Sequence, residues 1–179
     1  ATNVRCVQGA AYRVLLGEPT PRLAANLPAV PHGHTVLGMH LRSWPVAMEG
    51  DDNPPRKVPI DDWANMFFSC AEQALAELAT PALVYFATDE PSFRANATQR
   101  LARHGVTIVF GGDEVTHTRP SNKRGTRTRS DRGSDNAVAD WYALADSSHV
   151  FVGTRASTFS DAVIDRGCLG KLTHFWQLG

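Results

Sequence analysis

Four short polar motifs in this chain each follow an apolar run that has the length of a β-strand. They are His40-Leu41-Arg42, Thr88-Asp89-Glu90-Pro91, Gly111-Gly112-Asp113 and the segment 153–158, which contains Thr154, Ser157 and Thr158. In an open parallel sheet, ligands bind outside the carboxyl ends of the strands, so these motifs are expected to gather on one edge. An arginine, a carboxylate, a glycine turn and a pair of hydroxyls in one place suit a nucleotide diphosphate.

The first motif puts two polar side chains on the same side of a predicted strand. Alternation along a strand turns His40 and Arg42 the same way, and both lie at its carboxyl end. The guanidinium group of arginine offers a planar fork of donors that matches phosphate oxygens. A strand-end arginine paired with a surface carboxylate explains the same residues, and the three residues alone favour that simpler interpretation.

The second motif, Thr88-Asp89-Glu90-Pro91, has the composition of a helix start. Asp or Thr can cap a helix, and Pro is favoured in the first turn, so capping explains the motif by itself. A functional role for Asp89 would be to hold Arg42 or to bind a sugar hydroxyl.

Hydroxyl side chains crowd the last of the four motifs. They are Thr154, Ser157, Thr158 and Ser160, at a predicted junction between a strand and a helix. A helix amino terminus with hydroxyls beside it can bind an anion. Ser157 alone would serve as a helix cap, but four hydroxyls in seven residues favour ligand binding.

Asp140 stands inside a predicted helix, next to Trp141. Aspartate is a poor residue for a helix interior, and a solvent-exposed face is the default explanation. The alternative is a carboxylate that pairs with the two donor nitrogens of guanine.

The elements that must position these motifs alternate along the chain. Apolar runs predict strands at 35–41, 82–87, 106–110 and 149–152, with a short edge element at 172–176. Helical patterns predict helices at 59–78 and 91–104, one capped by Ser134 or Asp135, and one around 157–165. The buried sides of these helices are expected to include Met66 and Val138. Buried strands that alternate with helices predict an α/β fold, a Rossmann-like parallel sheet with helices on both faces.

The domain organisation follows from the same pattern. Residues 1–34 are broken by four prolines and are interpreted as a linker or the remnant of a preceding domain. Residues 35–179 are expected to form the nucleotide-binding domain, with a flexible basic loop at 113–133. The chain is long enough for one such domain with a hydrophobic core.

Composition narrows the classes of partner. The 18 basic and 18 acidic residues balance to zero formal charge, and no apolar run is long enough to span a bilayer. We therefore expect neither a nucleic-acid partner nor membrane contact from this segment. Cys6, Cys70 and Cys168 lack zinc-site spacing, so no structural metal is expected, and Cys70 is interpreted as a core thiol.

Taken in order, the motifs resemble the donor-binding half of GDP-fucose-dependent fucosyltransferases, the group that includes protein O-fucosyltransferases and core fucosyltransferases. The family's strand ending in His-x-Arg is matched by residues 38–42, and its aliphatic strand running into Ala-Thr-Asp by residues 85–91. Its helix acid, strand and hydroxyl-rich turn are matched by residues 140–160. The resemblance covers roughly residues 35–167 and implies the C-terminal domain of a GT-B glycosyltransferase.

This resemblance implies a role for each matching residue. Arg42 would bind the diphosphate and steady it as fucose leaves, with Asp89 supporting Arg42 or the sugar. The other donor-binding positions would be His40 against the nucleoside, Asp140 on guanine, and Thr154, Ser157 and Thr158 near the phosphates. The implied reaction is inverting transfer of fucose to a glycan or protein acceptor, without a metal or other cofactor.

Other functions stay open at this point. The same fold could use another nucleotide sugar, or serve as a non-catalytic module that binds GDP, a glycan or a protein. Ser43 and Trp44 stand where many relatives carry a second arginine or an acid, which leaves the acceptor class open. Eukaryotic relatives act in the Golgi or endoplasmic reticulum and bacterial ones in the cytoplasm; the sequon at Asn96 favours the former.

Overall fold

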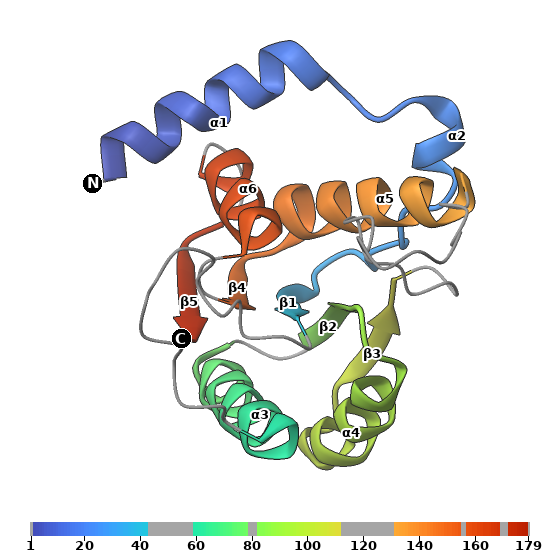
Figure 1. Ribbon diagram of the computed structural model, residues 1–179, viewed down its shortest axis with the longest axis vertical. Helices are drawn as coiled ribbons and strands as arrows, with labels where there is room; N and C mark the ends of the chain where they lie inside the picture. Colours follow the sequence, from blue (N-terminus) through green and yellow to red (C-terminus); the bar gives the residue numbers. More distant parts are fainter. Residues whose placement is uncertain are drawn as a thin grey trace, which may run out of the picture.

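The computed structural model describes residues 2–42, 59–78, 82–111, 131–154, 157–168 and 172–178, and a parallel β-sheet forms its centre (Figure 1). The strands are β1 (Thr35–Leu41), β2 (Ala82–Thr88), β3 (Thr107–Phe110), β4 (Val150–Thr154) and β5 (His174–Leu178). All neighbouring pairs are parallel, in the order β3-β2-β1-β4-β5. The predicted Rossmann-like α/β fold is therefore confirmed, and the order reverses direction between β1 and β4.

Helices cover both faces of this sheet (Figure 1). The helices are α1 (Thr2–Leu16), α2 (Pro21–Ala24), α3 (Ile60–Glu77), α4 (Pro91–Leu101), α5 (Asp131–Ser147) and α6 (Thr158–Gly167). Helices α3 and α4 lie on one face, α5 and α6 lie on the other, and α1 packs on the outer side of α6. No helix among the described residues is both long enough and apolar enough to cross a membrane.

The core has two apolar clusters, one on each face of the sheet. Strand alternation sends Met39 and Phe86 toward α3 and α4, where Phe67 packs in the same cluster. It sends Val36 and Tyr85 toward α5 and α6. Every residue of β2 is buried, as its continuous apolar run predicted.

Two predicted core residues and one helix boundary were wrong. Met66 is 50% exposed because the buried face of α3 is centred near Ala71, almost opposite Met66 on the helix. Val138 is 42% exposed because its neighbour Ala139 is the residue buried at that turn of α5. Helix α5 begins at Asp131, so its first residues belong to the helix and not to the predicted loop; 112–130 lie outside the described residues.

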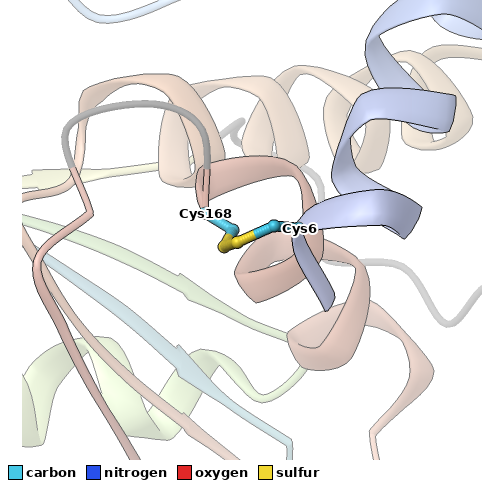
Figure 2. The surroundings of a disulfide bond; sticks show 2 residues. All are labelled: Cys6 and Cys168. Atoms are coloured by element: carbon cyan, nitrogen blue, oxygen red, sulfur yellow. A yellow bond between two sulfur atoms is a disulfide. The ribbon is translucent and has the colours of Figure 1, made fainter. Parts of the chain in front are cut away.

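Helix α1 was not predicted, and it is fixed to the body of the protein at several points. A disulfide joins Cys6 on α1 to Cys168 at the end of α6, with 5.3 Å between the Cα atoms (Figure 2). Gly9 then lies so close to α6 that a Cβ atom there would stand 1.9 Å from the carbonyl oxygen of Asp165. The absence of a side chain at Gly9 is therefore what allows the two helices to approach. The proposed domain boundary at residue 34 stays a prediction.

A buried charge cluster completes the contact of α1. The guanidinium group of Arg166 on α6 is fully buried, donates to both carboxylate oxygens of Asp146 at 2.9 and 2.8 Å, and lies 4.6 Å from the ring centroid of Tyr142. Arg13 of α1 approaches the same carboxylate at 3.5 Å, and the Tyr142 hydroxyl donates to the carbonyl of Leu16 at 3.0 Å. These contacts tie α1 to both α5 and α6.

Candidate functional site

The candidate site lies where the strand order reverses, at the carboxyl ends of β1 and β4. Residues Leu37–His40 pair with Val150–Gly153, and the helices that follow these two strands, α3 and α6, lie on opposite faces of the sheet. A crevice opens at such a switch point because the following segments diverge, and ligands of open α/β sheets bind there. The first and last predicted motifs thus meet in space.

Thr154 joins the ends of the two strands through its hydroxyl group. Its side chain is fully buried, accepts a hydrogen bond from the backbone N–H of Arg42 at 3.0 Å, and donates to the carbonyl of His40 at 3.2 Å. This hydroxyl therefore holds the backbone of the His-x-Arg motif in place. Donor binding by Thr154 stays a prediction.

The backbone N–H and the backbone carbonyl of Arg42 both form hydrogen bonds to side chains. The indole Nε1 of Trp63, on α3, donates to the carbonyl of Arg42 at 3.2 Å. The register pairs Leu41 with Thr88, so the next residues, Arg42 and Asp89, follow neighbouring strands at the same edge of the sheet. This placement suits the predicted support of Arg42 by Asp89. The expected Asp or Thr cap of α4 was wrong: the N-cap is Glu90, whose carboxylate accepts from Ser92 N–H at 3.2 Å.

His40 lies between β1 and the first turn of α6. Its Nδ1 atom is 2.8 Å from the hydroxyl oxygen of Ser160, and its ring centroid is 4.4 Å from that of Phe159. Burial, reinforced by the nearby positive charge of Arg42, lowers the pKa of His40 to about 3. The imidazole is therefore neutral at physiological pH.

This lowered pKa predicts a pH dependence of stability. Between pH 6.5 and about 3 the unfolded chain binds a proton at His40 that the folded chain does not, so the free energy of unfolding falls as the pH falls. We expect a loss of about 2 kcal/mol at pH 5 relative to pH 7 from this group. Urea unfolding at the two pH values should show a smaller difference for His40→Asn. The matched control is His174→Asn, at an exposed position of β5, which should keep the wild-type difference.

The amino terminus of α6 faces the same switch point. Ser157 is buried and is its N-cap, because its hydroxyl accepts from Ser160 N–H at 3.5 Å. Thr158 is the first helical residue and is exposed. The N–H groups of a first turn have no partner within the helix, and the helix dipole adds positive potential there. The structure thus shows Ser157 in the capping role, with Thr158 open to solvent beside it.

Asp140 lies elsewhere on the same edge, beside the end of β3. Its Oδ1 accepts a hydrogen bond from the hydroxyl of Tyr85, on β2, at 2.7 Å. Its carboxylate also lies against Gly111, where a Cβ atom would stand 2.2 Å from Oδ1. Burial and the adjacent Asp140 charge raise the pKa of Tyr85, so its phenol remains a hydrogen-bond donor. Asp140 is therefore half-buried and held by a specific partner, and not on a solvent-exposed face.

An open cleft of about 600 Å³ adjoins this pair. Its walls come from the α2 segment, the end of β3 and the first half of α5; the lining residues are Arg22, Asn26, Pro28, Tyr85, Val109, Phe110, Gly111, Asp135, Asn136 and Ala139. Arg22 forms an ion pair with Asp135 across it. A cleft of this size can hold a nucleoside or a comparable small molecule.

Removing the Tyr85 hydroxyl tests whether it organises this part of the cleft. Tyr85→Phe should lower the free energy of unfolding by about 1–2 kcal/mol, because one hydrogen bond to a half-buried carboxylate is lost. Chemical denaturation measures the change. Tyr12→Phe alters a phenol on α1, away from the cleft, and should have less effect; equal effects would contradict the assigned role.

The structure brings the predicted residues together in two groups. His40, Arg42, Thr154, Ser157 and Thr158 gather at the ends of β1 and β4, with Asp89 after the adjacent β2. Asp140 stands apart, by the end of β3, two strands from β1. The third motif lies partly outside the described residues, which include Gly111 but neither Gly112 nor Asp113.

Two contributors were missed in the sequence: Phe159, which contacts His40, and Tyr85, which holds Asp140. Ser160 was predicted among the hydroxyls of the last motif, but its contact with His40 was not. A polar hydroxyl in the otherwise apolar run of β2 was the available signal for Tyr85. Among the described residues, no three His, Cys, Asp or Glu side chains are grouped so as to hold a metal ion. Independence from metals stays a prediction.

Neither protein-family models nor curated proteins show a match to this sequence. Among solved structures, the crystal structure of POFUT1 in complex with GDP matches with a TM-score of 0.51 and 13% sequence identity. The alignment covers 98% of this chain and 48% of POFUT1, so the chain spans about half the length of that protein. At this identity the match establishes the fold alone, which is a Rossmann-like α/β fold similar to the matched part of POFUT1.

Proposed function

We propose that this chain is the donor-binding half of a glycosyltransferase that transfers fucose from GDP-fucose to a glycan or protein acceptor, with inversion. The observation that carries the proposal is the arrangement at the switch point, where Arg42 at the end of β1 and the amino terminus of α6 after β4 lie at the same edge of the sheet. Two independent sources of positive potential in one place favour a diphosphate. The structural neighbour POFUT1 was solved with GDP, which supports the choice of nucleotide.

Each group has a part in this proposal. The guanidinium of Arg42 binds the diphosphate, together with the first-turn N–H groups of α6 and the hydroxyl of Thr158. The neutral ring of His40 lies against the donor, and Asp140, held by the Tyr85 hydroxyl beside the end of β3, reads guanine. Asp89 supports Arg42 or the sugar.

In this reaction the protein must stabilise the leaving group, GDP. The bond between fucose and phosphate breaks toward an oxocarbenium-like transition state, and negative charge develops on GDP. Donors fixed in advance around the phosphates lower the barrier because they need no reorganisation when that charge appears. The backbone of Arg42 is held for this role, since its N–H donates to Thr154 and its carbonyl accepts from Trp63.

We also propose that the protein acts in the secretory pathway. The disulfide between Cys6 and Cys168 supports this location, because disulfides persist in oxidising compartments and are rare in the cytosol.

A thermal-shift panel tests the proposed donor. The protein is melted with GDP, GDP-fucose, ADP and UDP, each with and without magnesium. A ligand at about 100 times its dissociation constant adds roughly 2.7 kcal/mol of stability, which gives a clear shift. Stabilisation by GDP and GDP-fucose alone, without magnesium, supports the proposal. A larger shift with UDP or ADP would assign the site to another nucleotide sugar, and no shift with any of the four would count against nucleotide binding by this chain.

A further inference from the structure

The contact between His40 and Ser160 joins two residues that are 120 positions apart in the sequence. The two heavy atoms, Nδ1 and Oγ, are 2.8 Å apart, which is hydrogen-bond distance. Ser160 is fully buried, in the first turn of α6. The ring of Phe159 lies against the ring of His40, with 4.4 Å between the ring centroids. The imidazole of His40 is thus held at one defined nitrogen.

Gly153 shows how closely this arrangement is packed. A Cβ atom at Gly153 would stand 2.9 Å from the Ser160 hydroxyl and 2.6 Å from the ring of Phe151. Glycine at the end of β4 therefore leaves room for the serine to stand beside β1. The strand end, the helix start and the histidine form one packed unit.

A neutral imidazole can carry its single proton on either nitrogen, and the surroundings of Nδ1 decide which. That atom lies beside the amino-terminal turn of α6, where the backbone N–H groups create positive potential. Positive potential favours a lone pair at Nδ1 over an N–H. The Ser160 hydroxyl then donates to Nδ1, and the proton of the ring is placed on Nε2.

We propose that Ser160 is a positioning residue that fixes His40 in the Nε2–H tautomer, so that His40 offers a hydrogen-bond donor to an acceptor oxygen of the bound nucleotide. Nε2 points away from Ser160 by the geometry of the ring. Together with Arg42 and the start of α6, this gives the crevice a third donor. This role in binding rests on the proposed function, whereas the tautomer itself does not.

The tautomer is measured first, without ligand, from the ¹⁵N shifts of the His40 ring at pH 7. We expect an unprotonated Nδ1 and a protonated Nε2 in the wild-type protein. In Ser160→Ala the single tautomer should give way to a mixture, and Ser160→Thr, which keeps the hydroxyl, should restore it. The control is Ser148→Ala, which removes a fully buried hydroxyl from the segment before β4 and should leave the His40 tautomer unchanged.

GDP binding is then measured by calorimetry on the same proteins. Ser160→Ala should weaken binding about 3- to 10-fold, the size of one ordinary hydrogen bond, and Ser160→Thr should recover most of it. A protonated Nδ1 in the wild type, or an unchanged tautomer in Ser160→Ala, overturns the proposal. If the tautomer behaves as expected but the wild type does not bind GDP, the proposed function fails while the role of Ser160 in fixing the ring stands. Because the wild-type spectrum is itself decisive, the test does not depend on whether Ser160→Ala folds.

Discussion

Arg42→Ala is expected to weaken GDP binding by at least about 100-fold. The guanidinium group is the strongest anion-binding group at the switch point, and two charge-assisted hydrogen bonds to phosphate contribute about 3 kcal/mol or more. Arg42→Lys should lie between the wild type and the alanine variant, since a lysine keeps the charge but not the planar fork. Isothermal titration calorimetry with GDP gives the dissociation constants directly.

The matched control for Arg42 is another arginine with no connection to the crevice. Arg103 follows α4, has a side chain that is 61% exposed, and pairs with Glu72 of α3. Arg103→Ala should bind GDP like the wild type. Equal binding by Arg42→Ala and the wild type would contradict a diphosphate role for Arg42 and would favour an interaction module over a donor site.

The second large effect concerns stability. Replacing both Cys6 and Cys168 with serine should lower the free energy of unfolding by about 3–5 kcal/mol, with a fall in Tm on the order of 10 °C. The two cysteines are 162 residues apart, and a link across so long a loop removes much of the conformational freedom of the unfolded chain. Denaturant unfolding under non-reducing conditions measures the difference.

Two controls separate the effect of the link from the effect of new serines. Cys70→Ser changes the cysteine that has no disulfide and should cost much less. Adding a reductant should destabilise the wild type and leave the double variant unaffected. If the reductant changed both proteins equally, the loss could not be assigned to this bond.

Sequence patterns predicted the sheet and most of its helices because those elements bury regular apolar faces. The run in β2 is buried at every position, and Phe93, Ala97 and Leu101 of α4 point inward as their spacing indicated. Ser157 caps α6 as predicted, and Gly105 ends the turn after α4 with a φ of 67°. The predicted caps of α4 and α5 were wrong, because Glu90 caps α4 and α5 begins at Asp131.

Helix α1 was not predicted because its apolar side chains face solvent and not the body of the protein. Val7, Val14 and Leu15 are 70–83% exposed, whereas the face that packs on α6 and α5 carries Gly9 and Arg13. An amphipathic pattern assumes the opposite distribution. The disulfide was equally hidden, because three cysteines allow three pairings and spacing does not choose among them.

The candidate site was predictable in its residue types and less so in its partners. His40 and Arg42 were predicted as site residues because they lie at the end of a strand, and the carboxyl ends of parallel strands lie at one edge of the sheet. The partners of those residues depend on strand order, which the sequence did not specify. Ser160 reaches His40 only because β4 lies beside β1, and Tyr85 reaches Asp140 only because α5 crosses that face of the sheet.

The same disulfide also changes how the molecule would respond to being pulled. Tension applied to the backbone from outside Cys6 and Cys168 passes through the sulfur–sulfur bond and bypasses the segment between these two residues, whose sequence separation is 162. In the oxidised protein strands β1 to β4 are therefore shielded from stretching, whereas β5, which follows Cys168, is not. In the reduced protein the same tension would travel through α1, then β1, and would reach the His-x-Arg motif directly.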